Sequence, residues 1–314
     1  MTGVQTCALP ILLTDAFVNG ATLCEFCAQE QITLAEAMIR REVAMGEMTR
    51  DEIIEEMRKN LLVMREAIHR GLEDHVESVS HLSGGEAMRL FRYAKYEPFS
   101  GENTCRVAAS AMAVVEVNAA MGQIVAAPTA GASGILPGVL LECGIMRNWT
   151  DEQLIQGLFC AGAVGLLFAQ NATISGADGG CQAETGVGSA MAAASLVELS
   201  GGTPEQALDA SAMTIKNILG LVCDPVAGLV ECPCIKRNAL GAANALLCAD
   251  MALCGITSLI PFDEVVTAML TVGHDMRREY RETAMGGLAV TPTGKAVAAK
   301  VRRFQEYEKT SATY

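Results

Sequence analysis

Aromatic side chains are scarce in this sequence. Phe, Trp and Tyr together make up 4% of the 314 residues, whereas hydrophobic residues as a class make up 51%. A core of this composition must be filled by Ala, Leu, Val, Met and Gly, and such small residues suit close contact between helices. Strands of β-sandwiches favour aromatic and β-branched residues instead. The composition therefore argues against a β-sandwich and predicts an all-α fold.

Positive charge is scarce as well. The chain has 23 Lys and Arg residues against 36 Asp and Glu residues, which gives a net charge of −13 and a pI of about 4.8. Proteins that bind nucleic acids normally carry a basic stripe, and none is visible here. We therefore expect no nucleic-acid partner, and the acidic balance indicates solubility.

Uninterrupted apolar runs are short. The longest, at residues 157–169, falls below the roughly 20 residues that a membrane-spanning helix needs, so it predicts a buried helix. The N-terminus also lacks the basic segment that opens a secretory signal peptide. We therefore expect no membrane segment, no export and a cytoplasmic location. In a reducing compartment the twelve cysteines serve as core residues, metal ligands or nucleophiles rather than as disulfides.

The amino-acid composition of the chain changes along its length. Residues 1–11 resemble a translated sequencing-adapter fragment, so we expect a non-native leader there and leave Cys7 out of the functional argument. Residues 12–100 are polar and contain two capping boxes, Thr33–Glu36 and Thr49–Glu52. They predict an N-terminal helical layer.

From about residue 101 onwards, charges become sparse and Ala and Gly dominate. Apolar spacing, together with start signals such as Thr203–Gln206, predicts a multi-helix bundle in residues 101–314. Gly/Pro-rich breaks between these helices are expected to form interior loops around a pocket, and residues 12–314 to form one domain. The expected helices are 106–121, 151–170, 186–199, 204–219, 234–256 and 263–282.

The first Gly/Pro-rich break covers residues 126–138. Its small residues expose backbone N–H groups, and two hydroxyls add further donors, which together suit a carboxylate ligand. A tight helix–helix crossing that leaves no room for Cβ atoms would produce the same pattern, and the spacing alone does not decide between the two. The candidate carboxylate-binding residues are Thr129, Ala130, Gly131, Ser133 and Gly134.

The second break, at residues 171–184, mixes hydroxyls, glycines and one thiol. Asn171, Ser175 and Gly176 are further candidates for substrate binding. The thiol belongs to Cys181, and a lone cysteine in an apolar protein is usually a core residue.

The third break, at residues 220–238, holds Cys223, Cys232 and Cys234 among apolar residues. A soft-metal site and a plain buried loop would both look like this. The spacing of the last two thiols is too tight for zinc-finger ligation. The thiol at position 234 is expected at a helix N-terminus, which favours a thiolate. Lys236 and Arg237 follow and could neutralise an anionic ligand, or could be an ordinary solvated pair.

Other patterns do not form a metal site or a recognised cofactor site. Cys24 and Cys27 have a zinc-type spacing but no partner pair, and none of the four histidines has a metal spacing with another. Lys216 and Lys236 could form a Schiff base with pyridoxal phosphate, but their surroundings give no support, so none is expected. The histidines are His69, His75, His81 and His274. The remaining thiols, expected in the core, are Cys105, Cys143, Cys160, Cys248 and Cys254.

The three breaks together resemble the iron–sulfur-dependent L-serine dehydratase family, and specifically its separate α chain. The similarity runs from about residue 20 to 298, in long, ordered matches. The stretches that carry it are Glu116–Gly122, Pro128–Gly131, Ile174–Glu184, Gly220–Glu231, Pro233–Ala239 and Arg281–Ala289.

This resemblance implies a catalytic core in residues 101–314 with a 4Fe–4S cluster held by Cys181, Cys223 and Cys234. One iron without a protein ligand would polarise the hydroxyl of L-serine, and the products would be pyruvate and ammonia. Cys232 departs from the family pattern, which usually has an apolar residue there, and is expected to be a spectator. The resemblance also implies a separate β chain and an oligomeric enzyme. It assigns no catalytic base.

Three other functions stay open at this point. A cysteine desulfidase-like lyase would use the same cluster to expel sulfide. A non-enzymatic iron–sulfur protein, such as a redox carrier, would need a fourth protein ligand. A helical structural subunit without metal is the simplest alternative.

Overall fold

The computed structural model describes residues 17–46, 48–73 and 76–311. This part of the chain folds into thirteen α-helices with no strand, which confirms the all-α prediction. The expected leader at residues 1–11 and His75 lie outside the described residues. The helices are α2 (Gly20–Glu30), α3 (Leu34–Ala44), α4 (Arg50–Glu73), α5 (Glu86–Tyr93), α6 (Glu102–Ala119), α7 (Ile135–Arg147), α8 (Asp151–Asn171), α9 (Gly176–Gly179), α10 (Val187–Leu199), α11 (Pro204–Asn217), α12 (Cys234–Leu253), α13 (Phe262–Asp275) and α14 (Pro292–Ser311).

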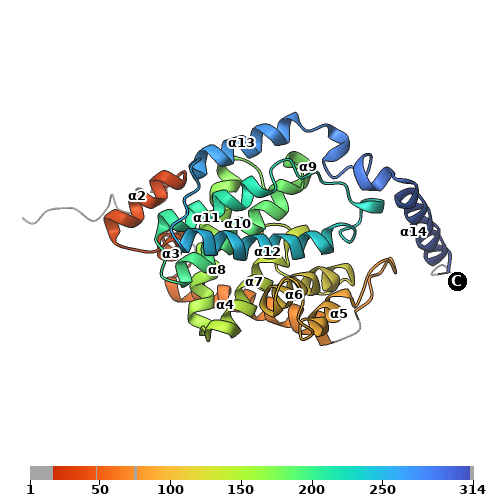
Figure 1. Ribbon diagram of the computed structural model, residues 1–314, viewed down its shortest axis with the longest axis horizontal. Coiled ribbons are helices and arrows are strands. Elements are labelled where there is room, and N and C mark those ends of the chain that lie inside the picture. The colour runs from red at the N-terminus through yellow and green to blue at the C-terminus, as the bar shows by residue number, and fades with distance from the viewer. Residues whose placement is uncertain (1–16, 47, 74–75, 312–314) are drawn as a thin grey trace, which may run out of the picture.

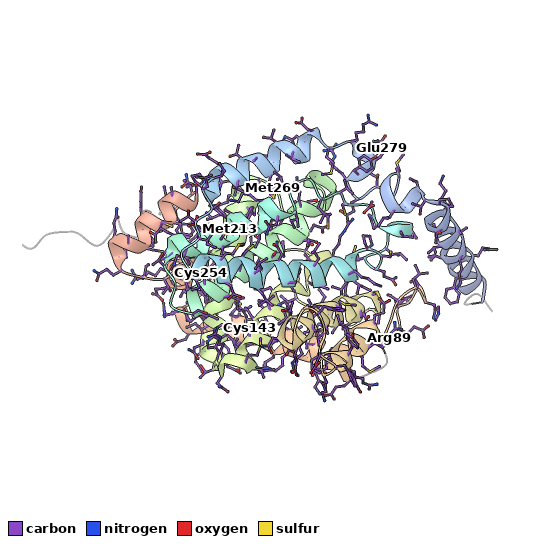
Figure 2. All side chains as sticks on the ribbon, in the orientation of Figure 1. Arg89, Cys143, Met213, Cys254, Met269 and Glu279 are labelled. Carbon is purple, nitrogen blue, oxygen red and sulfur yellow. The ribbon has the colours of Figure 1, made fainter. Side chains whose placement is uncertain are left out.

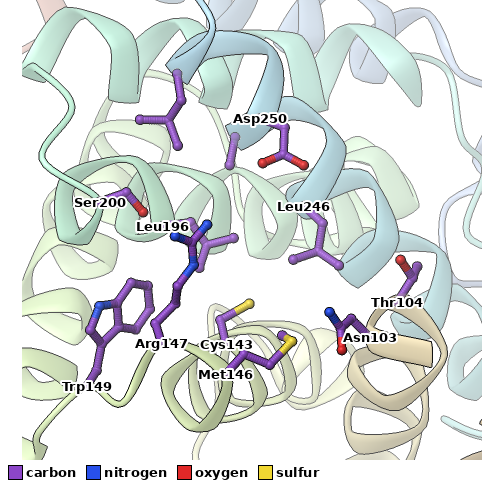
Figure 3. A pocket seen from close by; sticks show the side chains of 12 residues that line it. Asn103, Thr104, Cys143, Met146, Arg147, Trp149, Leu196, Ser200, Leu246 and Asp250 are labelled. Atoms are coloured by element: carbon purple, nitrogen blue, oxygen red, sulfur yellow. The ribbon is translucent and has the colours of Figure 1, made fainter. Parts of the chain in front are cut away.

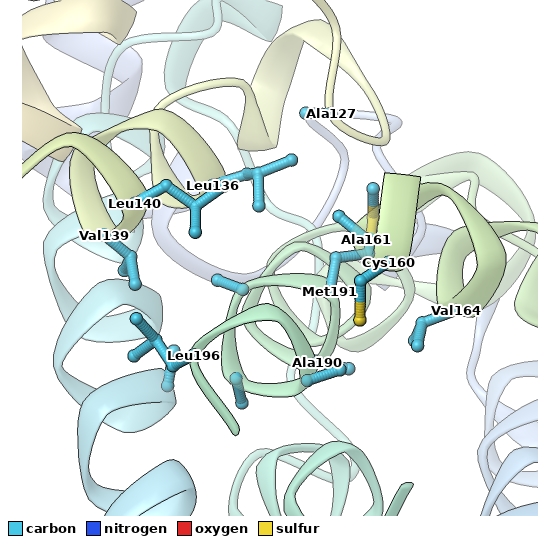
Figure 4. Close-up of a cluster of buried hydrophobic side chains, with 14 of the residues drawn as sticks. Ala127, Leu136, Val139, Leu140, Cys160, Ala161, Val164, Ala190, Met191 and Leu196 are labelled. Atoms are coloured by element: carbon cyan, nitrogen blue, oxygen red, sulfur yellow. The ribbon is translucent and has the colours of Figure 1, made fainter. Parts of the chain in front are cut away.

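Helix α10 is the centre of the bundle. Every residue from Val187 to Val197 is buried, and α10 packs against α7, α8, α11 and α12. Most of these residues are Ala, Gly or Ser, and their small side chains let the neighbouring helices approach closely, as the sequence predicted. Figure 4 shows part of this apolar core, where side chains of α7, α8 and α10 come together, among them Leu140, Val164 and Leu196.

The helices of residues 17–100 lie on the outside of this core, with α4 packed on α6 and α3 packed on α8 (Figure 1). Three carboxylates from residues 101–314 accept hydrogen bonds from N–H groups at the N-termini of these outer helices, which have no partner within the helix. A carboxylate in this position satisfies free donors and complements the helix dipole. The pairs are Asp263 with Gly20 and Ala21, Glu198 with Leu34 and Ala35, and Glu116 with Glu86 and Ala87.

Most of the expected helices occur within a few residues of their predicted bounds. Helix α8 begins after the capping box at Thr150, and α11 begins at Pro204 after the capping box at Thr203. The helix predicted over 263–282 is wrong in its last part, because α13 ends at Asp275 and the backbone at Met276 is extended. Helix α7 was missed, since its first residues lie in the Gly/Pro-rich break at 126–138.

Among the described residues, one helix is long and apolar enough to cross a membrane by length and composition alone. This helix is α8, and 61% of its most apolar window is buried inside the protein. Helix α8 packs against α3, α4, α7 and α10, so it is a core helix of the bundle.

Candidate active site

The three Gly/Pro-rich breaks meet at one cavity of about 330 Å³. Each break contributes to its wall, although the breaks are far apart in the sequence. A fourth segment, the loop after α13, adds one carboxylate. The lining residues are Thr129, Ala130 and Gly131 from the first break, Ile174, Ser175, Gly176 and Glu184 from the second, Cys223, Pro225, Gly228, Val230 and Cys234 from the third, and Glu282 from the loop.

The structure brings the three predicted cluster ligands together. Cys223 and Cys234 line the cavity, and Cys181 lies close enough that its charge raises the pKa of both other thiols. Burial is the largest cause that raises the pKa of each of the three thiols, to about 12 for Cys234. Three thiols that resist ionisation on their own, two of them buried and Cys234 half-buried, are thus gathered from two separate breaks.

The local backbone structure sets the position of each of these thiols. Cys181 stands immediately before a π-helical turn, Gln182–Gly186, that leads into α10. Cys223 lies in an extended segment whose N–H donates to Tyr280 O and whose carbonyl accepts from Glu282 N, both at 2.8 Å. Cys234 is the first residue of α12, as expected. None of the three is in the middle of a regular helix.

Arg237 is the cation of the site. Its guanidinium donates to Asp224 Oδ1 at 2.8 Å and to Val222 O at 2.7 Å, and the side chains of Arg237 and Asp224 are only 13% and 4% exposed. The charge of Arg237 lowers the pKa of Cys181, against the larger effect of burial. Lys236 points elsewhere and forms an ion pair with Glu86, so of the two predicted cations only Arg237 belongs to the site.

Glu184 is a site residue that the sequence analysis missed. Its Oε1 accepts a hydrogen bond from Thr129 Oγ1 at 2.8 Å, and its Oε2 lies 3.7 Å from Cys223 Sγ. Burial is the largest cause that raises its pKa above the usual range. A Cβ atom on Gly176 would lie 2.5 Å from Oε2, and one on Gly131 would lie 3.2 Å from Oε1. The signal that could have revealed Glu184 is a carboxylate three residues after Cys181 in a segment of small residues.

Three predicted substrate-binding residues lie outside the cavity lining. The Ser133 hydroxyl donates to Ala130 O, and Gly134 N donates to the side chain of Asn238. The Asn171 amide donates to Val18 O and Leu167 O. The structure places the other five, Thr129, Ala130, Gly131, Ser175 and Gly176, on the cavity wall.

The other cysteines in the described part of the chain do not line this cavity. Cys232 is exposed and does not line the cavity. Cys105, Cys143, Cys160 and Cys248 are buried, as predicted, but the prediction for Cys254 is wrong. Cys254 is exposed because it follows the last residue of α12, whereas Cys234 is the first residue of that helix. Figure 2 labels Cys254.

The donor atoms of this cavity suit a soft metal centre. Thiolates are soft ligands that select iron–sulfur clusters, zinc or copper(I). A Cys/Glu group of three potential ligands also occurs here, since the ligand atoms of Glu184, Cys223 and Glu282 lie within 4.8 Å of one another. The cavity can therefore combine a metal centre with a carboxyl group and a wall of small residues for an organic ligand.

Comparison with known proteins agrees with this geometry. Residues 29–289 match the family model described as "Serine dehydratase alpha chain". The chain is 51% identical to the "Probable L-serine dehydratase, alpha chain" of Bacillus subtilis (strain 168), over 91% of this chain and 95% of the relative. It is 42% identical to the "L-serine dehydratase, alpha chain" of Peptoniphilus asaccharolyticus, over 89% of this chain and 94% of the relative. It is also 38% identical to an "L-serine dehydratase" of Mycobacterium bovis, of which it covers 62%. This chain belongs to the serine dehydratase alpha chain family.

Proposed function

We propose that the protein is the catalytic α chain of an L-serine dehydratase. The reaction removes water from L-serine, and the resulting aminoacrylate tautomerises and hydrolyses to pyruvate and ammonium. The observation that carries the proposal is the convergence of Cys181, Cys223 and Cys234 near one cavity. Family membership favours serine dehydration over a desulfidase or an electron carrier, since the relatives are named for L-serine.

We propose that these three thiols hold a 4Fe–4S cluster. The donor set fits such a group, because three neighbouring thiols with raised pKa values need a cationic partner to be stable as thiolates. Arg237 alone provides one positive charge, and it is already paired with Asp224. When bound, a cluster with three protein thiols supplies an iron with an open position that acts as a Lewis acid.

The chain's own residues would then bind and orient serine. Thr129, Gly131, Ser175 and Gly176 line the cavity beside Glu184. A substrate carboxylate next to Glu184 is favourable only when the Glu184 carboxyl is neutral, and burial favours that form. We propose that a neutral Glu184 holds a proton at Oε2 and donates it to the departing hydroxyl group, which leaves as water. A base takes the Cα proton, and the electron pair of the Cα–H bond forms the double bond of the aminoacrylate.

A second subunit completes the proposal. The relatives that match over nearly their whole length are named α chains, which supports a separate β chain and a hetero-oligomer. The chain covers only 62% of the M. bovis relative, so that protein contains a further segment that this chain does not match. We further propose a cytoplasmic location and a single α-chain domain in residues 12–314.

The test is anaerobic reconstitution with iron and sulfide, followed by measurement of pyruvate from L-serine with and without a β chain. We expect pyruvate formation that depends on the cluster. Sulfide release from L-cysteine without turnover of L-serine would favour the desulfidase alternative. A cluster with a fourth protein ligand, and with a spectrum unaffected by L-serine, would contradict the lyase proposal.

A further inference from the structure

A second cavity, of about 450 Å³, lies between the N-terminus of α6 and the C-terminal parts of α7, α10 and α12 (Figure 3). None of the residues that line it also lines the thiol cavity. Its volume is within the range of small-molecule sites, about 300–1,000 Å³. It is therefore a candidate binding site separate from the catalytic one.

Charges of both signs face this cavity without partners. Arg147, the last residue of α7, and Asp250 of α12 both line it, and neither side chain forms an ion pair or hydrogen bond with the described part of the chain. They also form no ion pair with each other, so a ligand can lie between them (Figure 3). Polar side chains of Asn103, Thr104 and Ser200 on the same wall have no side-chain hydrogen bond in the described residues either.

The N-terminus of α6 adds further donors to this wall. Gly101 precedes that helix and provides no side-chain cap, so the first N–H groups of α6 keep their hydrogen-bonding capacity. Asn103 and Thr104 belong to this first turn. A guanidinium and free helix N–H groups are both suited to a carboxylate.

The rest of the wall is apolar. Leu196, Leu246 and Leu253 come from α10 and α12, and Cys143, Met146 and Trp149 come from α7 and the segment after it. A small polar molecule such as serine would leave these groups without contacts. An apolar side chain would fill the space between them.

We propose that this cavity binds a free α-amino acid with an apolar side chain, of the size of leucine or methionine. Arg147 binds the α-carboxylate and Asp250 binds the α-ammonium group, while the leucine and thioether side chains of the wall contact the ligand side chain. A free amino acid carries these two opposite charges next to one another, which matches a wall with one unpaired cation and one unpaired anion. A neutral sugar would use neither charge, and a multiply charged anion would be repelled by Asp250.

Isothermal titration calorimetry on the full chain, with L-leucine and L-methionine as ligands, tests the proposal. We expect binding of both, roughly tenfold weaker or more for each of the variants Arg147→Gln and Asp250→Asn. L-Leucinamide lacks the carboxylate and N-acetyl-L-leucine lacks the ammonium group, and each should bind as weakly as leucine binds the corresponding variant. Both substituted residues are exposed, so the variants should fold normally.

Matched controls make the outcome specific. Arg303→Gln and Asp275→Asn make the same charge changes at exposed positions elsewhere and should leave leucine binding unchanged. Cys234→Ala alters the thiol cavity and should also leave it unchanged, so that the result is independent of the proposed catalytic function. The proposal is overturned if leucine gives no heat of binding, if leucinamide binds as well as leucine, if serine binds as tightly as leucine, or if Cys234→Ala abolishes the binding.

Discussion

Two kinds of buried cysteine occur in this protein, and burial alone does not distinguish them. Cys105, Cys160 and Cys248 are buried within helices, whereas Cys181 and Cys223 are buried, and Cys234 is half-buried, at junctions between elements. Burial raises the pKa of both kinds, to about 11 for Cys248 and about 12 for Cys234. A raised thiol pKa therefore does not identify a ligand.

The two kinds differ in backbone and in neighbours. Cys105 Sγ donates to the carbonyl of Leu90 and Cys248 Sγ to the side chain of Asn244, so each has a partner of its own within the packed bundle. Of the junction thiols, Cys223 and Cys234 line a cavity together with Glu184, and Cys181 lies near Arg237, whose charge lowers its pKa. Irregular backbone allows side chains from distant segments to point toward one place, and a cluster site needs this convergence.

Replacing cysteines of the two kinds by alanine should have the largest effects on serine turnover and bound iron, and the effects of the two kinds should differ most. In anaerobically reconstituted protein, Cys181→Ala, Cys223→Ala and Cys234→Ala should each lower serine turnover roughly hundredfold or more and reduce bound iron, because each removes a ligand. Cys160→Ala, in the core, and Cys232→Ala, beside the site, should keep iron and turnover. Iron and acid-labile sulfide analysis checks this, and unchanged iron in all three site variants would refute the ligand assignment.

The buried ion pair of the site should matter more for folding than an exposed one. Arg237→Met leaves the Asp224 carboxylate, 4% exposed, without its cation, and should lower the free energy of unfolding by about 3–5 kcal/mol. Arg65→Met removes the partner of Asp151 where both side chains are over 40% exposed, at 44% and 41%, and should cost about 0–1 kcal/mol. Urea unfolding of both variants gives the comparison, and equal losses would show that the Arg237 pair is not special.

The sequence predicted those parts of the fold that depend on local signals. The start signal at Thr203–Gln206 located the start of α11, and the Gly/Pro-rich breaks located the three walls of the cavity. It could not show which side of α12 faces the cavity. Lys236 and Arg237 are adjacent, so they point about 100° apart, and only the packing of α12 decides which one reaches the thiols.

The role of half-buried carboxylates was not predictable for a related reason. Glu184 contacts Thr129 from 55 residues away, and Glu198 contacts Leu34 from 164 residues away. Neither contact leaves a local pattern in the sequence. Such pairs depend on tertiary packing, which single-sequence periodicity does not encode.

The carboxyl of Glu198, which lies away from the thiol site, predicts that the free energy of unfolding depends on pH. Burial raises its pKa from 4.5 to about 7, although its oxygens accept hydrogen bonds from two N–H groups of α3. Between pH 4.5 and about 7, the folded state therefore holds a proton on Glu198 that the unfolded state has lost. Its contribution to stability, on the order of 3 kcal/mol, is present below pH 4.5 and disappears as the pH rises to about 7.

Urea unfolding at several pH values between 4.5 and 8 tests this dependence. Glu198→Gln should remove this part of the pH dependence. Glu66→Gln, at an exposed position of α4, should retain the full dependence of the unchanged protein. If Glu198→Gln retains the full dependence too, then Glu198 does not titrate in this range.

A methyl group added to a glycine of helix α8 and one added to a glycine of the thiol cavity should change the free energy of unfolding in opposite directions. These changes should be the smallest of those predicted. In α8, a Cβ atom on Gly162 meets only Met38 Cγ, at 3.9 Å, so Gly162→Ala should stabilise the helix by about 0.5–1 kcal/mol. At the site, a Cβ atom on Gly176 would lie 2.5 Å from Glu184 Oε2 and 3.1 Å from Cys223 Sγ. Gly176→Ala should therefore push the Glu184 carboxyl away from Cys223 and cost about 1–2 kcal/mol, within the range for overpacking. Thermal unfolding measures the stability difference, and serine turnover should fall only in Gly176→Ala, because only that methyl group displaces a residue of the cavity wall.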